Sequence, residues 1–499
     1  MWGFIQKNIN DIIYLSLLLF SVFIGYYYRK LTTVEAKKWG GTILGLILIL
    51  IVSGYNAVHP IFSASLGIFA IKAATIKYCH LIAFFWMFGY LFFFRLADKF
   101  GFTLSSGQTN LIEMIMVLRV VGVAFEMNGS WLAIAKAKRK KGEVAKSENI
   151  EESKKQGVKD DEFLELINPD TIDLFHYSFS YIGLLTGPYY RYRTFDDYFH
   201  LPFSKHVDCF GFTINTLKTV PLFVSLYLAF SSIHPLEYIL TEEHNNRSFF
   251  FRMLFPWVLF TAFRHRIYAG MTLAECVCTS AGLGAYPVHG MNRTGHGPTV
   301  GYLKLKEMSE DEARKIEYDF KTIESMEVVR CESVVTLRES MKVWNKAVQY
   351  WVAMVVYKRF PIKPLKIHAA LFVSVIWHGF HAGYFFCIYF CPFYLMAEDI
   401  YYKLYYKEAT GRKKKIIGFI MWFLRSHSES YQAAAFLLLT FDRIWIYYSS
   451  VYFYWYGVWL VFLILGIILN QIHKSKRLRN IHAAENLQKV EKNRSVKQM

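Results

Sequence analysis

The chain is dominated by apolar blocks long enough to cross a lipid bilayer. A bilayer core of about 30 Å takes about 20 residues of helix, and 54% of the 499 residues are hydrophobic. The most apolar blocks are residues 12–28, 42–58, 81–94, 217–232, 249–263 and 454–472. Less apolar blocks lie at residues 111–127, 164–185, 273–286, 343–356 and 416–439. Because hydrocarbon offers a backbone no hydrogen-bond partner, the pattern predicts an all-α polytopic membrane protein with about eight to twelve spans.

One further apolar stretch, residues 367–397, contains no Asp, Glu, Lys or Arg. It is too long for a single crossing, and Gly379, Gly383 and Pro392 predict a break within it. His378 and His381 lie near its middle. An unpaired buried polar group costs roughly 2–7 kcal/mol, so ionisable residues inside a membrane are candidates for function. The structural alternative is a pair of hydrogen-bonded histidines in a helix bundle.

Polar segments divide the rest of the chain. We expect a charged loop at residues 136–162, a polar insert at 287–332 and a basic cytosolic tail at 474–499. Within the insert, residues 308–327 have helical spacing, and Ser309 with Glu312 forms a predicted capping box. There is no internal repeat and no soluble domain of independent size. We therefore expect residues 1–473 to form one membrane domain.

The net charge of +18 is concentrated in clusters at residues 136–141, 412–415 and 474–479. By the positive-inside rule these clusters face the cytosol, where the leaflet is anionic. Each cluster adjoins an apolar block, so the predicted partners are membrane lipids and not nucleic acid. The sixteen histidines form no second His-x-x-His pair beside His378 and His381, so no metal site and no cofactor are predicted.

Two motifs carry a family resemblance. "MKVWNKAVQYW" places Asn345 before an apolar run, and "IWHGFH" contains His378. Together they resemble the membrane-bound O-acyltransferase (MBOAT) family, whose catalytic pair is an Asn and a His in such settings. "LLTGPYYRYRTFDDY", "AECVCTSAGLGAYPV" and "IEYDFKTIESME" are similar to its lysophosphatidylinositol acyltransferase branch.

The resemblance implies an MBOAT-type bundle of about eleven transmembrane helices around a substrate chamber. It implies acyl-CoA as cosubstrate and lysophosphatidylinositol as acceptor, with a polyunsaturated chain such as arachidonoyl entering the sn-2 position. It also implies a multi-pass protein of the endoplasmic reticulum membrane.

The implied chemistry agrees with what the residues can do. A thioester is already activated, whereas an alcohol is a weak nucleophile until it loses its proton. A neutral His378 imidazole could remove that proton, which is typically worth roughly 10²–10⁴-fold in rate. The Asn345 amide could donate to the oxyanion that attack creates.

Other side chains are expected to bind substrate. Tyr189, Tyr190, Arg191 and Arg193 offer aromatic and cationic groups for the phosphates of acyl-CoA or of a lysolipid, and interfacial anchoring is the alternative. Since Arg191 and Arg193 are two residues apart, we expect only one of them to face a phosphate.

Trp377 and His381 flank the catalytic histidine candidate, His378. Either could line a substrate tunnel, and His381 could instead orient His378 or simply pack.

Two kinds of alternative remain open. Within the family, the acceptor could be lysophosphatidylserine, lysophosphatidylcholine, a sterol or a protein. From another class, a proton-coupled transporter would use a buried histidine together with carboxylates such as Glu113 and Glu126.

Overall fold

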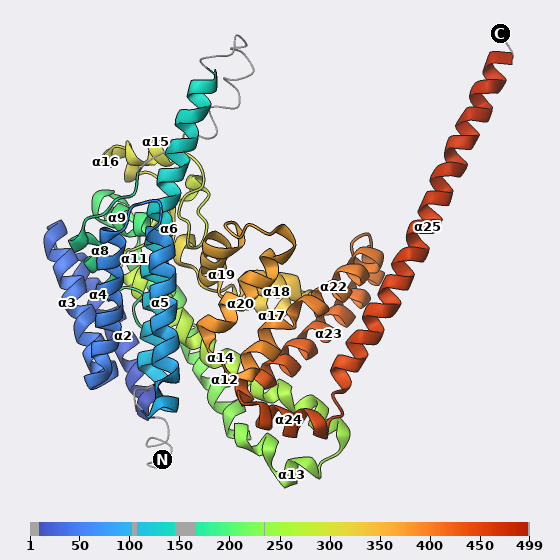
Figure 1. The fold of residues 1–499 in the computed structure, drawn as a ribbon, viewed down its shortest axis with the longest axis horizontal. Helices are drawn as coiled ribbons and strands as arrows, with labels where there is room; N and C mark the ends of the chain where they lie inside the picture. Colours follow the sequence, from blue (N-terminus) through green and yellow to red (C-terminus); the bar gives the residue numbers. More distant parts are fainter. Residues whose placement is uncertain (1–8, 102–106, 145–165, 234, 498–499) are drawn as a thin grey trace. The chain divides into compact units, whose positions relative to one another are not determined.

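The computed structural model describes residues 9–101, 107–144, 166–233 and 235–497, and these residues form two compact units. The first contains Met1–Ala229, Ala262–Val328 and Lys342–Phe380, and the second contains Phe230–Thr261, Val329–Met341 and His381–Met499. Both are almost entirely helical (Figure 1). Residues 1–473, expected as one domain, thus include parts of both units.

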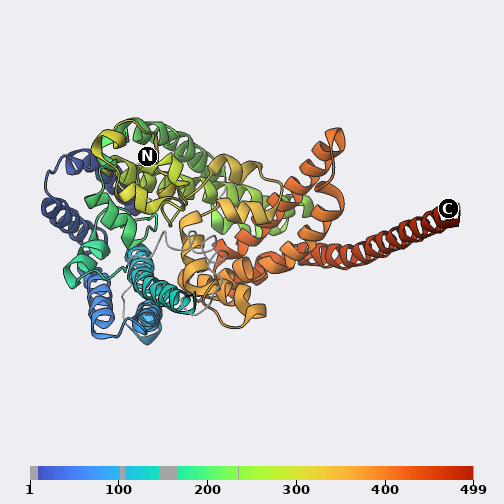
Figure 2. The same cartoon turned by 90° about the horizontal axis from the view of Figure 1, so that it is seen from above.

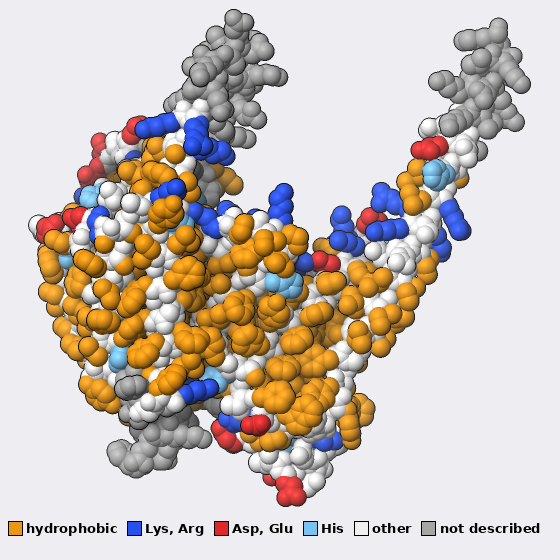
Figure 3. Space-filling view, in the orientation of Figure 1, with side chains coloured by type: hydrophobic (Ala, Val, Ile, Leu, Met, Phe, Trp, Pro, Cys, Tyr) orange, Lys and Arg blue, Asp and Glu red, His pale blue; other side chains and the backbone are white. Residues whose placement is uncertain are grey.

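The first unit is built on long helices near the N-terminus. They are α2 (Ile9–Arg29), α3 (Val34–Ser53), α4 (Val58–Ala73), α5 (Cys79–Leu96) and α6 (Gly107–Val144), with short 3₁₀ turns η1 (Gly54–Ala57) and η2 (Ala97–Phe100). Figures 1 and 2 show α3, α4, α5 and α6 standing side by side. Their outward side chains are apolar, as lipid-facing positions require (Figure 3).

Shorter elements complete this unit. They are α8 (Thr171–Phe179), α9 (Tyr192–His200), α10 (Phe203–His206), α11 (Cys209–Leu217), β1 (Tyr286–Pro287), η5 (Val288–Gly290), α15 (Tyr302–Lys306), α16 (Glu310–Ala313), β2 (Tyr318–Asp319), η6 (Lys321–Ile323), α19 (Lys346–Val352), η7 (Ala353–Tyr357), η8 (Lys363–Leu365) and α20 (Lys366–His378). The boundary between the units falls inside α12 (Val220–Ile233), α14 (Phe249–Ala281), α17 (Val328–Ser333) and α18 (Leu337–Val343).

The second unit consists of η4 (Leu236–Leu240), α13 (Glu242–Asn245), α21 (Ala382–Tyr384), η9 (Phe385–Tyr389), α22 (Cys391–Tyr401), η10 (Tyr402–Tyr406), α23 (Gly411–Leu438), α24 (Phe441–Ser450) and α25 (Tyr454–Lys497). Its core is rich in buried tyrosine, including Tyr394, Tyr431, Tyr447 and Tyr448. The Tyr448 hydroxyl donates to the Tyr431 carbonyl over 2.7 Å.

Five stretches among the described residues are long and apolar enough to cross a membrane. They are Asp11–Arg29, Val34–Ala73, Cys79–Leu96, Cys209–Leu240 and Tyr454–Asn486. Each contains one of the most apolar blocks of the sequence, so the multi-pass class is confirmed. The remaining block of that group, residues 249–263, lies in α14, which also carries Arg252, Arg264 and Arg266. A total of about eleven crossings stays a prediction.

Two local expectations differ from the structure. In the described part of the expected span at residues 164–185, which starts at residue 166, the only helix is the nine-residue α8, and the chain from Ser180 to Arg191 is not helical. The expected loop from Lys136 is helical as far as Val144, because its Ala, Lys and Arg residues are strong helix formers; the rest of that loop lies outside the described residues. The basic tail continues α25 as a helix.

The polar insert is partly as expected. The capping box of Ser309 and Glu312 is present, which confirms the predicted helix start. The helix, however, ends at Ala313, because Tyr318 and Asp319 pair with β1 as a strand.

The predicted break in residues 367–397 is confirmed. Helix α20 ends at His378, and Gly379 follows with φ 148°, a backbone conformation that favours glycine. Pro392 lies in the first turn of α22, where its missing N–H costs nothing.

Buried arginine replaces helical hydrogen bonding where the backbone becomes irregular. After α8, the Arg119 guanidinium donates to the carbonyls of Tyr177, Ser178 and Ser180, at 2.9–3.2 Å, and to that of Ile182. A carbonyl buried without a donor costs several kcal/mol in an apolar interior. Arg119 therefore serves the last carbonyls of α8 and explains how residues 180–182 can be buried without forming a helix.

The second unit places one glycosylation sequon opposite the C-terminal tail. Asn246, exposed at the end of α13, lies near α24, since His244 packs 6.1 Å from the Tyr447 ring. Helix α25 begins just after α24, and its apolar first half is followed by the basic residues 474–479 (Figure 3). A crossing by α25 therefore puts Asn246 on the lumenal side when the tail is cytosolic.

We predict that Asn246 is the sequon that carries a glycan. Asn128 and Asn292 are also followed by the sequon pattern, but their amides are held by backbone or side-chain partners, including the Ile76 carbonyl at 3.0 Å and Asp319 at 2.8 Å. Asn246→Gln should abolish the endoglycosidase-sensitive shift in electrophoretic mobility, whereas Asn128→Gln should leave it unchanged. A glycan on Asn493 in the tail would reverse the proposed orientation.

Candidate active site

The histidine that sequence reasoning singled out ends helix α20. His378 is half-buried, and its ring lies 5.0 Å from that of Trp377. The Gly379 N–H donates to the Val375 carbonyl over 2.8 Å and closes the last turn. Because the final carbonyls of a helix have no partner within it, the backbone beside His378 needs donors from elsewhere.

Arg95, at the end of α5, supplies those donors. Its two terminal nitrogens donate to the carbonyls of Ile376 and Trp377, each over 2.7 Å. Its Nε donates to the Asn110 side chain on α6 over 2.8 Å. A cation at a helix C-terminus also interacts favourably with the helix dipole. Arg95 thus fixes the two peptide groups that precede His378.

Trp377 adds a second link to α6. Its indole N–H donates to the Met114 carbonyl over 3.0 Å, and the side chain is buried. The structure therefore shows that Trp377 packs against α6 and helps to orient the end of α20; the substrate contact expected from the sequence stays a prediction.

Asn345 stands at the start of α19 in a strained conformation. Its φ of 43° and ψ of 55° are left-handed, a region that asparagine tolerates better than most residues. The side-chain amide of Asn345 makes no hydrogen bond within the part of the chain that the structure describes. Its backbone carbonyl accepts from the backbone N–H of Gln349. The amide is therefore available to a substrate.

The neighbouring lysine holds Asn345 in place. The Lys346 ammonium binds Glu324 at 2.5 Å and Glu327 at 2.7 Å, and its backbone N–H donates to the Ser325 carbonyl. Helix α19 in turn packs against α20. The structure thus places Asn345 and His378 in one compact unit, on two helices in contact.

His381 belongs to the second unit. It precedes α21, is exposed, and has its ring 5.9 Å from that of Tyr384. A role for His381 at His378 stays a prediction.

The tyrosines and arginines expected to bind phosphate form a buried network. The Arg191 Nε lies 3.0 Å from the Glu126 carboxylate, which also accepts from the backbone N–H groups of Tyr192 and Arg193. The Tyr190 hydroxyl donates to the Ile182 carbonyl over 2.7 Å, and Tyr189 is buried. These contacts favour a structural role over phosphate binding.

Arg193 has its own buried surroundings. Its guanidinium lies 4.7 Å from the ring centre of Tyr302, close to Asp197. Burial raises the pKa of Asp197 to about 6, although hydrogen bonds from Tyr286 and Tyr302 and the Arg193 charge oppose that shift. Neither arginine of "YYRYR" therefore lies open to a phosphate.

A histidine that the sequence did not single out lies beside this network. His296 packs 5.7 Å from the ring of Tyr350, whose hydroxyl accepts from Arg191. Burial and the nearby Arg191 charge lower the pKa of His296 to about 3, so it is neutral at physiological pH. A neutral His296 adds no second positive charge beside the ion pair of Arg191 and Glu126.

The sequence also gave no sign of Arg95 as part of the site. A lone arginine after an apolar block is typical of interfacial anchoring, and its carbonyl partners lie more than 280 residues away. The one local indication that a donor such as Arg95 is needed was the predicted end of a helix at Gly379, because the last carbonyls of a helix lack partners within it.

Comparison with known proteins identifies the family of the chain. Residues 66–441 match the membrane-bound O-acyltransferase family. The chain is 41% identical over 470 residues to the Drosophila melanogaster membrane-bound acylglycerophosphatidylinositol O-acyltransferase frj, covering 94% of each chain. It is 31% identical to the human acylglycerophosphatidylinositol O-acyltransferase MBOAT7, covering 93% of this chain and 95% of the relative. The Xenopus laevis protein mboat7 is also 31% identical, covering 94% and 96%.

The chain belongs to the membrane-bound O-acyltransferase family. It is therefore an integral membrane acyltransferase, which decides against the transporter alternative. Glu126 and Glu113, the carboxylates that had left that alternative open, are engaged by Arg191 and by the Ser63 hydroxyl at 2.9 Å.

The buried pair of Arg191 and Glu126 yields a stability prediction. Arg191→Met should lower the unfolding temperature in detergent, because an uncompensated buried carboxylate typically costs about 3–5 kcal/mol. Adding Glu126→Gln to Arg191→Met should recover part of the loss, since the double variant has no unpaired charge. An unchanged unfolding temperature together with a raised KM for a phosphate-bearing substrate would instead make Arg191 a substrate ligand.

Proposed function

We propose that the protein transfers a fatty acyl group from acyl-CoA to the sn-2 hydroxyl of lysophosphatidylinositol. The observation that carries the acceptor is the similarity, along nearly the whole chain, to relatives named acylglycerophosphatidylinositol O-acyltransferases. The preferred acyl chain in this proposal is polyunsaturated, such as arachidonoyl, and the site of action is the endoplasmic reticulum membrane. The product is a remodelled diacyl phosphatidylinositol.

In this proposal His378 is the general base. The lysolipid hydroxyl loses its proton to the neutral imidazole as its oxygen attacks the thioester carbonyl carbon. The tetrahedral intermediate then collapses, the carbon–sulfur bond breaks, and the CoA thiolate receives the proton from His378. No covalent acyl-enzyme is needed, because the thioester is already activated.

Asn345 has the complementary role. Its amide makes no hydrogen bond among the described residues, so it is free to donate to the oxyanion when that charge develops. A donor held ready before the reaction lowers the barrier more than one that must reorganise. The strained backbone of Asn345 is consistent with a position held for function and not for local stability.

The test of this mechanism compares single variants in purified protein. His378→Ala should lower acyl transfer by about 10²-fold or more. Asn345→Ala should lower kcat by about 10²–10³-fold with little change in KM, because the oxyanion exists only after attack. The measurement is release of free CoA in the presence of matched inositol, serine and choline lysolipids.

His368→Ala is the matched control, since His368 is an exposed histidine on the same helix, α20. It should keep near-normal activity. Full activity of His378→Ala would remove the assigned base, and a preference for lysophosphatidylcholine in the wild type would refute the acceptor while leaving the family unaffected.

Arg95 gives a separate prediction for positioning. Arg95→Met should reduce kcat while changing KM little, because the carbonyls of Ile376 and Trp377 lose their donors and the end of α20 shifts. Arg95→Lys should retain only part of the activity, since one ammonium cannot reproduce the planar fork of a guanidinium.

Arg266→Met is the control for Arg95→Met, because Arg266 forms an exposed ion pair with Asp11 at 2.7 Å. Its activity should match the wild type. Equal losses in both variants would mean that the effect comes from general loss of stability.

A further inference from the structure

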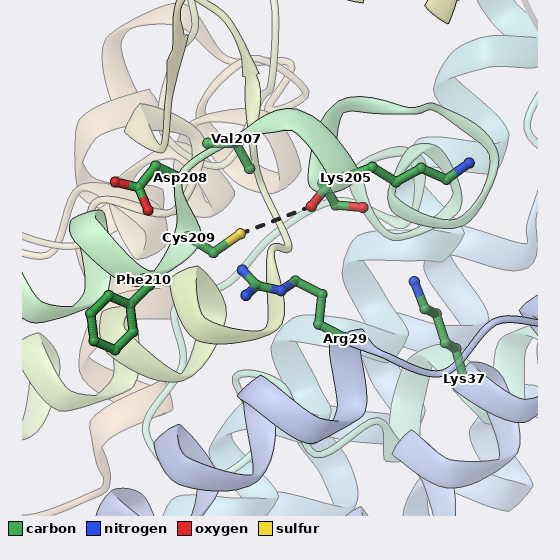
Figure 4. Close-up of a pocket in the computed structure, with 8 residues that line it drawn as sticks. Arg29, Lys37, Lys205, Val207, Asp208, Cys209 and Phe210 are labelled. Carbon is green, nitrogen blue, oxygen red and sulfur yellow. Dashed lines mark hydrogen bonds between the residues drawn. The ribbon is translucent and has the colours of Figure 1, made fainter. Parts of the chain in front are cut away.

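A basic pocket lies in the first unit, apart from the residues assigned to catalysis. It has a volume of about 290 Å³ and is lined by Arg29, Lys37, Ser204, Lys205, Val207, Asp208, Cys209 and Phe210. Figure 4 shows the Arg29 guanidinium beside Cys209, with Lys37 and Lys205 on neighbouring segments. The lining comes from the end of α2, the start of α3, and the chain from α10 to α11.

Among the described residues, the cations of this pocket have no carboxylate partner. Within the described part of the chain, no Asp or Glu oxygen lies at ion-pair distance from Arg29, Lys37 or Lys205; Lys37 instead lies 5.3 Å from the Tyr198 ring. The charges of Lys205 and Arg29 repel that of Lys37. Asp208 also lines the pocket, but its carboxylate accepts from the Gly211 N–H over 2.8 Å to cap α11.

The surrounding backbone is arranged around Arg29. Gly282 has φ +85°, and a Cβ there would lie 3.1 Å from the Ser204 Cβ and 3.6 Å from the Arg29 Cδ. The Cys209 thiol donates to the Ser204 carbonyl over 4.0 Å and so ties the start of α11 to α10. These contacts hold the pocket walls in place without neutralising the cations.

The pocket faces the cytosol if the basic clusters do. Lys38 binds Asp173 and the Lys72 ammonium donates to the Pro169 carbonyl, so the start of α3 and the end of α4 meet beside α8. The chain therefore reverses direction between α3 and α4. If α3, α4, α5 and α6 each cross the membrane, an even number of crossings separates Arg29 from Lys136, and the two residues lie on the same side. The positive-inside rule places both on the cytosolic side.

We propose that this pocket is a binding site for a phosphate group. Three cations that line one pocket and have no ion-pair partner among the described residues fit a phosphate anion, to which arginine and lysine donate charge-assisted hydrogen bonds. The volume of about 290 Å³ lies near the lower end of the range for ligand pockets, about 300 to 1,000 Å³, and accommodates a phosphorylated headgroup. The site is distinct from the buried arginines of "YYRYR", and it does not depend on the acyl-transfer mechanism.

Two sources could supply the phosphate at a cytosolic membrane surface. One is a soluble nucleotide such as coenzyme A, and the other is the headgroup of an anionic phospholipid. Both present the same phosphate oxygens to Arg29, Lys37 and Lys205, so competition can separate them.

The test uses the full-length protein in phosphatidylcholine nanodiscs, with inorganic pyrophosphate as the probe. Lys37→Gln and Lys205→Gln should each weaken pyrophosphate binding about ten-fold or more, because each removes a charge-assisted contact. Lys30→Gln is the matched control: it removes the same charge from an exposed neighbour that lies over the Tyr26 ring and does not line the pocket. It should bind pyrophosphate like the wild type.

A second readout separates a ligand site from interfacial anchoring. Without anion, Lys37→Gln should unfold at a higher temperature than the wild type, because the substitution relieves repulsion among three cations. Displacement of pyrophosphate by coenzyme A would identify the nucleotide as the source, and displacement by phosphatidylinositol in the nanodisc would identify the lipid headgroup. Equal pyrophosphate binding by Lys37→Gln, Lys205→Gln and Lys30→Gln would overturn the proposal.

Discussion

Every backbone polar group inside this protein needs a hydrogen-bond partner, because neither lipid nor a packed interior supplies one. Helices meet that demand along most of the chain. Where a helix stops while the backbone stays inside the protein, a guanidinium can provide the donors. Arg119 does so at the end of α8 and for residues 180–182, and Arg95 does so at the end of α20. Arginine suits this role because it stays charged and presents several donors in a fixed plane. The position of His378 depends on the second of these contacts.

The same residue type therefore has different roles in different surroundings. Arg191 lies inside the unit, where a cation without a counter-charge would be costly, and Glu126 provides that charge. Arg29, Lys37 and Lys205 line a pocket whose cations lack such a partner within the part of the chain that the structure describes. A cation that must bind an exchangeable anion cannot also be neutralised by a carboxylate of the protein. The lack of a nearby carboxylate therefore says more about anion binding than the presence of an arginine or lysine does.

The assigned catalytic residues stand where local structure is least regular. His378 is the last residue of its helix, before a glycine with positive φ, and Asn345 has a left-handed backbone at the start of α19. Helix ends leave side chains and backbone groups uncommitted, which is what a proton acceptor and an oxyanion donor require. The stability lost there is offset nearby, by Arg95 at one helix and by the ion pairs of Lys346 at the other.

The sequence alone determined the properties that depend on local pattern. Block length and hydrophobicity were sufficient for the all-α membrane class, Gly379 for the end of α20, and Ser309 with Glu312 for a helix start; the motifs around Asn345 and His378 were sufficient for the family. The tertiary structure alone decided that residues 166–185 contain no spanning helix, that Arg191 is paired, that Arg95 holds the end of α20, and that Arg29 and Lys205 line one pocket. The reason is physical: hydrophobic periodicity acts over a few turns of chain, whereas a buried cation takes whichever carbonyl or carboxylate the fold brings beside it.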